Sequence, residues 1–189
     1  MTAWIEFQEG GHGGPETERA LDNVRLRRGK VANVFRAQGL LPHTIAPHLD
    51  LYTALMFGPG PLSREDRELV AVVVSSFNDC EYCVAHHSEA LRGSWRNDER
   101  VRTAARDFRR LPLPRKTQLL LEYAEQLTHK PFSMDVSLID ELREAGAGDD
   151  EILQVNLITA YFNFVNRVAL GLGVTHTDEE VSGYLDEER

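Results

Sequence analysis

Ser63-Arg-Glu-Asp-Arg-Glu-Leu-Val-Ala-Val-Val-Val74 is the stretch that decides the fold class of this chain. Its β-branched end favours a strand. Its beginning favours a helix, because Ser63 is a good N-cap and because Glu65 and Asp66 occupy a first turn in which the helix dipole stabilises negative charge. The break Gly58-Pro-Gly-Pro61 precedes it, and no second strand-like run is present for it to pair with. We therefore expect a central helix that is apolar on all sides.

The remaining sequence also shows helical patterns, separated by glycine and proline. A helix is expected over 16–30 that either continues or restarts to about residue 38. Further helices are expected over 41–57, 80–93, 97–108, 116–128, 137–144 and 152–170. The predicted fold class is all-α, a compact multi-helix bundle of about eight helices. We expect an N-terminal arm over residues 1–14, a single all-helical domain over 15–174 and a loose acidic C-terminal tail over 175–189, with Trp4, Ile5 and Phe7 attaching the arm to the core.

Length and charge exclude several classes of function. At 189 residues, the chain is expected to form one domain. A net charge of -9 argues against nucleic-acid binding through a basic surface, and we interpret the basic cluster 25–30 as a solvated helix face. No apolar run approaches the ~20 residues of a membrane span. No secretory signal is visible, so we expect a cytoplasmic protein that does not bind membranes.

The chemistry of the chain is concentrated in Cys80-Glu-Tyr-Cys-Val-Ala-His-His87, which contains its only two cysteines. Offsets of three, four and seven residues fall on one face of a helix, so Cys80, Cys83 and His87 are expected to share a solvent-reachable pocket. A helix N-terminus and a nearby imidazole both favour a thiolate. Because Cys83 lies one turn before His87, we expect Cys83 to be activated and to attack first. Cys80 then resolves the product as a disulfide.

Glu68 lies twelve residues before Cys80 and is a candidate for orienting His87. A thiol, a base and a carboxylate that orients the base form an activated-nucleophile arrangement. The alternative is that Glu68 is a solvated residue of the first helical turn. His86 points roughly 100° away from His87 on a helix and is expected to be a surface or packing residue.

Other interpretations of these residues remain open. The cysteines can be small buried hydrophobic residues, or they can bind a metal together with a histidine, although a structural zinc site needs four ligands. A polar stripe on the last long helix can serve helix packing, a subunit interface or the site. It consists of Asn156, Thr159, Asn163 and Arg167.

Glu68, Cys80-x-x-Cys83 and His87 together resemble the alkylhydroperoxidase D-like family, which shares its fold with carboxymuconolactone decarboxylase. The similarity is greater to the peroxidase-related branch and extends to Ser63–Glu68, Tyr161–Arg167 and 170–173. It implies an all-helical homo-oligomer with thiol peroxidase activity. By motif match, Cys83 is implied to be the peroxidatic cysteine, Cys80 its disulfide partner, and His87 and Glu68 the proton relay. A lipoyl- or thiol-bearing protein is the implied reductant.

One position departs from the family pattern, because Tyr82 stands where the type enzyme has a histidine. The resemblance therefore does not fix the substrate as an alkyl hydroperoxide. Our leading hypothesis is an enzyme that reduces hydroperoxides through Cys80 and Cys83, without a metal or cofactor. The alternatives are a general disulfide oxidoreductase of the thioredoxin-like α/β type and a non-enzymatic, redox-sensing helical assembly protein.

Overall fold

The computed structural model describes residues 2–6 and 14–184. Within these residues it contains ten α-helices, three short 3-10 helices and no strand, which confirms the all-α prediction. The chain forms two compact units, one made of the segment up to Phe57 together with the segment from Arg167, and the other made of Gly58–Asn166. The parts of the predicted arm and tail that fall on residues 1, 7–13 and 185–189, including the expected contact of Phe7, lie outside the described residues.

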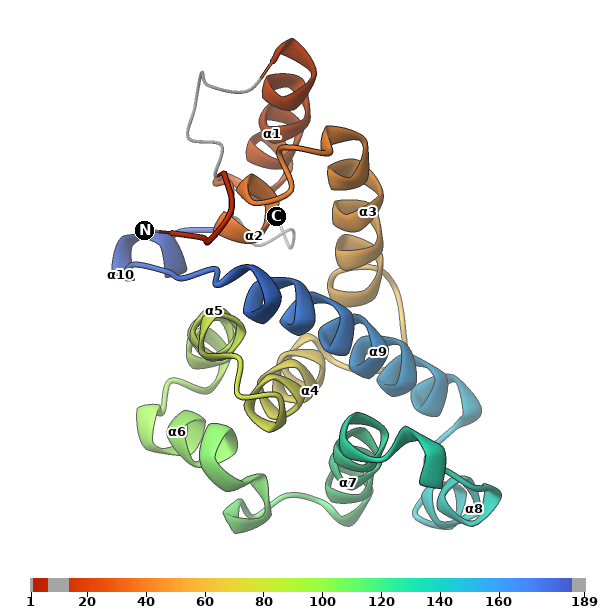
Figure 1. Ribbon diagram of the computed structural model, residues 1–189. Coiled ribbons are helices and arrows are strands. Elements are labelled where there is room, and N and C mark those ends of the chain that lie inside the picture. Colours follow the sequence, from red (N-terminus) through yellow and green to blue (C-terminus); the bar gives the residue numbers. More distant parts are fainter. Residues whose placement is uncertain (1, 7–13, 185–189) are drawn as a thin grey trace. The chain divides into compact units, whose positions relative to one another are not determined.

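The helices follow the chain in the order labelled in Figure 1. The first unit contains α1 (Pro15–Arg28), α2 (Asn33–Arg36), η1 (Pro42–Thr44), α3 (Ile45–Met56) and α10 (Asp178–Val181). The second contains α4 (Arg64–Phe77), α5 (Glu81–Trp95), α6 (Asp98–Asp107), η2 (Phe108–Arg110), α7 (Arg115–His129), η3 (Pro131–Ser133) and α8 (Val136–Glu144). α9 (Asp149–Leu172) contributes residues up to Asn166 to the second unit and the residues that follow to the first.

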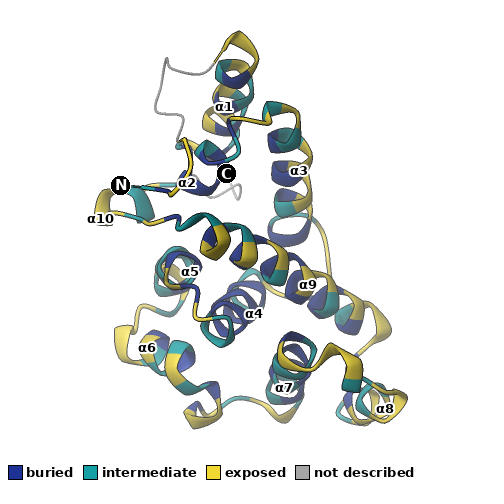
Figure 2. Ribbon diagram, in the orientation of Figure 1, coloured by how far each residue is buried: buried dark blue, intermediate teal, exposed yellow. Residues whose placement is uncertain are grey.

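α4 is the helix on which the second unit is built. Ser63 caps it, because its hydroxyl accepts a hydrogen bond from the Asp66 N–H at 3.1 Å. Every residue from Arg67 to Ser75 is buried, and α5, α6 and α7 pack against this helix (Figures 1 and 2). The run 70–74, which is valine at every position except Ala71, therefore forms the helix interior expected from the cap and the acidic first turn, because burial on all sides outweighs the strand preference of valine.

In the first unit, the helical pattern over 16–38 restarts rather than continuing as one helix. α1 ends at Arg28, because Gly29 adopts a left-handed conformation (φ 74°) and its N–H donates to the Arg25 carbonyl at 2.8 Å. This is a common way for a glycine to terminate a helix. The chain restarts as the four-residue helix α2.

The described part of the C-terminal segment is not loose, which corrects the sequence expectation. Asn33 holds it with two hydrogen bonds, from its side-chain amide to the Thr175 carbonyl at 3.0 Å and from its backbone N–H to the Glu180 carboxylate at 2.9 Å. At the other terminus, the Trp4 N–H donates to the Leu172 carbonyl at 2.7 Å. The arm is thus attached through its backbone, while the Trp4 side chain remains 72% exposed.

The connection between α4 and α5 determines where the cysteines lie. Asp79 adopts a left-handed conformation (φ 53°), and the Cys80 N–H donates to the Ser75 carbonyl at 2.9 Å. Cys80 becomes the N-cap of α5, and Cys83 lies in its first turn. The expected end of this helix at Gly93 is wrong, because α5 continues to Trp95 and ends at Arg96 in the left-handed region. Among the described residues, no helix is both long enough and apolar enough to cross a bilayer.

Candidate functional site

Cys80 and Cys83 lie together at the beginning of α5. Both are free thiols, and they approach to 3.3 Å. Their exposed fractions are only 1% and 3%, so the solvent-reachable pocket expected from the sequence is instead a buried pair. Thiols at this separation need only a small movement to reach the ~2.05 Å of a disulfide bond.

The environment makes the two thiols unequal in acidity. A hydrogen bond from the Cys83 S–H lowers the pKa of Cys80 and outweighs the burial that raises it, while Asn166 and the charge of His86 lower it further. The same hydrogen bond and deeper burial hold the pKa of Cys83 well above its usual value. The more acidic thiol is therefore Cys80, whereas the sequence led us to expect Cys83.

His87 and Glu68 form the contact predicted for them. The His87 Nδ1 lies 2.6 Å from the Glu68 Oε2, and Glu68 is 1% exposed. A carboxylate only accepts, so Nδ1 carries a proton, and this leaves Nε2 as the nitrogen that can accept a proton from a thiol. The Phe162 ring packs edge-on against the imidazole, with 4.6 Å between the ring centroids. His87 is thus held as a base of defined tautomer.

Arg64 is a member of the site that the sequence analysis did not single out. Its guanidinium forms an ion pair with Oε1, the second oxygen of Glu68. Each oxygen of this buried carboxylate therefore faces a donor, which is the condition for keeping such a charge in a protein interior. The i, i+4 spacing of Arg64 and Glu68 was visible in the sequence and is typical of such a pair.

His86 is a packing residue with an electrostatic effect on the site. Its Nδ1 lies 2.8 Å from the Tyr82 carbonyl, and its ring is tilted against the Tyr82 ring with 4.4 Å between centroids. The packing role agrees with the sequence expectation, whereas the effect on Cys80 does not follow from the spacing.

Asn166 is a further polar residue that the sequence analysis did not single out. Its side chain is fully buried and donates to the Ser75 hydroxyl at 3.1 Å, and hydrogen bonding by Asn166 acts to lower the pKa of both thiols. Asn78 donates to the Asn166 Oδ1 at 3.0 Å. The clue in the sequence was an amide side chain within the apolar part of α9. The members of the polar stripe have different partners. Asn163 accepts a hydrogen bond from Asn78, whereas Asn156 donates to the Tyr123 hydroxyl.

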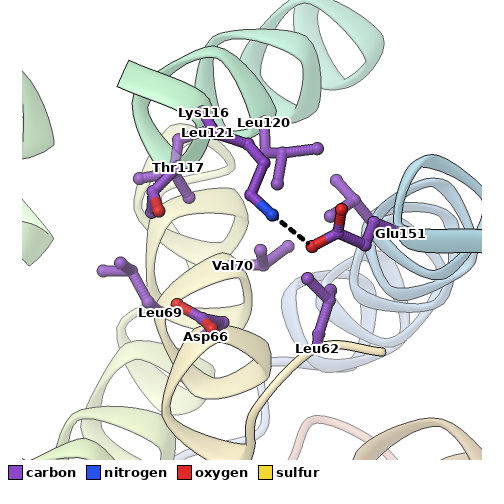
Figure 3. Close-up of a pocket in the computed structure, with 10 residues that line it drawn as sticks. Leu62, Asp66, Leu69, Val70, Lys116, Thr117, Leu120, Leu121 and Glu151 are labelled. Carbon is purple, nitrogen blue, oxygen red and sulfur yellow. Dashed lines mark hydrogen bonds and ion pairs between the residues drawn. The ribbon is translucent and has the colours of Figure 1, made fainter. Parts of the chain in front are cut away.

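A separate small cavity lies between α4, α7 and α9 (Figure 3), with a volume of about 70 Å³. Lys116 and Glu151 form an ion pair beside it at 2.7 Å. None of Glu68, Cys80, Cys83 and His87 lines this cavity. Among residues 2–6 and 14–184, no three side chains of His, Cys, Asp or Glu gather as a metal would require.

Comparison with known proteins finds a family match and solved structures of the same fold. Residues 47–107 match the carboxymuconolactone decarboxylase family. An uncharacterized peroxidase-related protein from Silicibacter sp. TM1040 superposes with a TM-score of 0.85 at 26% identity, covering 95% of this chain and 94% of that one. A search of curated proteins found no match.

Two further solved structures share the fold. An uncharacterized peroxidase-related protein from Ralstonia eutropha JMP134, an alkylhydroperoxidase AhpD core, has a TM-score of 0.85 at 24% identity, covering 96% of this chain and 95% of that one. The debrominase Bmp8, as a cysteine-to-alanine variant with 2,3,4-tribromopyrrole, has a TM-score of 0.77 at 18% identity, covering 95% of both chains. The matched segment and the Silicibacter relative support the resemblance of this chain to the alkylhydroperoxidase D-like and carboxymuconolactone decarboxylase family, and the other two structures share its fold.

Proposed function

We propose that this protein is a thiol-dependent peroxidase that reduces hydroperoxides through Cys80 and Cys83. The observation that carries the proposal is the buried thiol pair at 3.3 Å. The pair begins the helix that also holds His87, whose imidazole is oriented by Glu68. The peroxidase-related relatives support a function of this class.

The reaction consumes two thiols and one hydroperoxide. The Cys80 thiol gives its proton to the His87 Nε2, directly or through water, and the thiolate attacks the O–O bond. A sulfenic acid forms on Cys80, and the leaving alkoxide takes the proton back from His87 as an alcohol. Cys83 then attacks the sulfenic sulfur, the S–S bond forms, and the hydroxyl group leaves with the Cys83 proton as water. A two-electron reductant restores both thiols.

The proposed order of attack follows thiol acidity. The thiolate is the nucleophile, and the structure stabilises it on Cys80. The family resemblance implies the reverse order, with Cys83 attacking and Cys80 resolving. The two orders give different products when one cysteine is replaced, so a single experiment tests the function and the order together.

Cumene hydroperoxide consumption with dithiothreitol as reductant is the test. We expect turnover by the wild-type protein, with a loss of two free thiols per chain after one turnover. Cys80→Ser should lose the rapid reaction with peroxide. Cys83→Ser should react once and then over-oxidise at Cys80, because its resolving thiol is absent. Ser88→Ala, on the same helix, is the control.

The results separate the alternatives. Turnover no faster than that of a Cys80→Ser/Cys83→Ser double variant would reject the peroxidase. If the wild-type protein failed as a peroxidase but reduced the disulfides of insulin, the proposed function would become that of a general disulfide oxidoreductase. A rapid reaction that is lost in Cys83→Ser and kept in Cys80→Ser would restore the order implied by the family.

We further propose three properties, of which the first two are implied by the family resemblance and the third is expected from the sequence. The chain assembles as a homo-oligomer, a lipoyl- or thiol-bearing protein supplies its electrons, and it acts in the cytoplasm. A reducing compartment suits an enzyme whose resting state has two free thiols. Turnover with a dihydrolipoyl protein as the reductant would support the proposed electron donor. No turnover with any of the protein dithiols tried would contradict it.

A further inference from the structure

A chain of amide side chains connects the end of α4 to α9. It consists of Asn163, Asn78 and Asn166, which are joined in that order by hydrogen bonds of 3.1 and 3.0 Å. Asn166 donates to the hydroxyl of Ser75, whose carbonyl accepts from the Cys80 N–H at 2.9 Å, and hydrogen bonding by Asn166 acts to lower the pKa of both thiols. Asparagine is a costly residue to bury unless its polar atoms are satisfied, and Asn166 is fully buried.

Two backbone carbonyls fix the direction of every amide in this chain. The Asn163 Nδ2 donates to the Thr159 carbonyl at 3.0 Å, so its Oδ1 must face Asn78. The Asn78 Nδ2 lies 3.2 Å from the Val74 carbonyl oxygen as well as near the Oδ1 atoms of Asn163 and Asn166, so its two hydrogens are shared among three oxygens. Because the Val74 carbonyl only accepts, the Asn78 NH₂ group, and not its oxygen, faces Asn166. A carbonyl oxygen can only accept, and these assignments therefore leave no freedom to exchange oxygen and nitrogen.

The consequence for Asn166 is a single permitted orientation. Its Oδ1 is occupied by the donor from Asn78, which turns its NH₂ group toward the Ser75 hydroxyl and the two sulfurs. One N–H is used on Ser75 at 3.1 Å. The other is available for sulfur, and a thiolate is the strongest acceptor there.

We propose that Asn166 is a catalytic residue of this site, whose amide donates a hydrogen bond to whichever sulfur carries the negative charge. Asn78 and Asn163 are positioning residues that aim it. Hydrogen bonds to a charged acceptor are stronger than neutral ones, and burial strengthens them further. The donor stabilises the thiolate before attack and the thiolate released when the disulfide is reduced. This inference concerns the same cysteines as the proposed function, but its test needs no peroxide.

The test is a thiol titration followed by the ultraviolet absorbance of the thiolate, which does not depend on access of a reagent to the buried pair. In Asn166→Ala, we expect the first thiol pKa to rise by about one unit or more, a tenfold or greater loss of thiolate at a given pH. Asn166→Asp keeps the size of the side chain but replaces the NH₂ donor with an oxygen, so it should raise the first thiol pKa at least as much as Asn166→Ala does. The other titratable groups at the site are His86, His87 and Glu68, and all remain in these variants.

Asn156→Ala is the matched control. Asn156 lies on the same helix and also donates from its side chain, but to the Tyr123 hydroxyl at 2.7 Å. It should leave the thiol titration unchanged. A folded Asn166→Ala protein with the wild-type titration would overturn the proposal, whether or not the protein reduces peroxides.

A measurement on the wild-type protein covers the case in which both Asn166 variants fail to fold. Nuclear magnetic resonance of the side-chain amides should show the Asn166 NH₂ signals shifting with pH in step with the thiol absorbance. The Asn156 signals should not shift with it. Asn166 signals that stay constant while the thiols ionise would contradict the donor role.

Discussion

At the scale of single residues, Glu68 has the largest influence on the base of the site. It is almost fully buried and both of its oxygens face cationic or N–H donors, Arg64 on one side and His87 on the other. The spacing of Glu68, Cys80, Cys83 and His87 made the carboxylate a candidate for orienting the imidazole, but only the folded structure shows that it reaches the ring. It did not predict Arg64 or Asn166, because their roles depend on which side of a helix is covered by another element.

Glu68→Gln tests the carboxylate directly. The amide keeps the size of the side chain but loses the charge that holds His87 and neutralises Arg64. General acid–base catalysis contributes roughly 10²–10⁴-fold, and we expect hydroperoxide turnover to fall by at least about tenfold. The free energy of unfolding should fall by about 1–3 kcal/mol, because a partly buried guanidinium loses its partner. Steady-state kinetics and urea unfolding measure the two effects.

Glu65→Gln is the control for this variant. Glu65 precedes Glu68 by three residues on α4, and its side chain is 43% exposed. Its replacement should change turnover little, because it does not contact His87 in the described structure. Equal losses in the two variants would show that Glu68 acts through general charge on α4 rather than through the imidazole.

At the scale of elements, the sequence predicted the helices better than their ends. The type of α4 was predictable from its cap and acidic first turn, even though its interior favours a strand. Gly29 and Gly93 show why the ends were not. Both are glycines after an arginine, but Gly29 turns left-handed and ends α1, while Gly93 remains within α5. Tertiary packing decides between these conformations, since glycine itself adopts both.

α9 carries a stripe of exposed apolar side chains that bears on assembly. Leu153, Leu157 and Phe164 are 58%, 43% and 50% exposed, and spacings of four and seven residues place them on one face of the helix. Exposed apolar side chains that follow one another on a face are typical of a protein–protein contact. We propose that this stripe takes part in the homo-oligomer.

Leu157→Lys combined with Phe164→Lys tests this stripe. Charges in an apolar contact are strongly unfavourable, so the variant should sediment as a smaller species than the wild-type protein in analytical ultracentrifugation. Phe132→Lys is the control, because Phe132 is 87% exposed but lies in η3. A wild-type monomer would contradict the oligomer, and an unchanged assembly in the double variant would exclude this face from the contact.

At the scale of the whole molecule, the two units can be followed separately. The chain has two tryptophans, Trp4 in the first unit and Trp95 in the second. The predicted boundaries of a single domain over 15–174 came from composition and length, which do not reveal that α9 contributes to both units. Those boundaries remain a prediction, which unfolding of the two tryptophan environments can address.

The buried His48 makes the stability of the first unit depend on pH. Burial lowers the pKa of His48 to about 4, from an unfolded value of 6.5, and the Gln38 amide donates to its Nδ1 at 2.8 Å. Between these values the unfolded chain binds a proton that the folded chain does not, so stability is full above pH 6.5 and falls as the pH is lowered toward 4. The loss should reach about 3 kcal/mol. Urea unfolding of a Trp95→Phe protein, followed by Trp4 fluorescence, measures it. Adding His48→Gln to this protein should reduce the change in the free energy of unfolding between pH 6.5 and pH 4. An equally steep decline with and without His48 would assign the pH dependence to other groups.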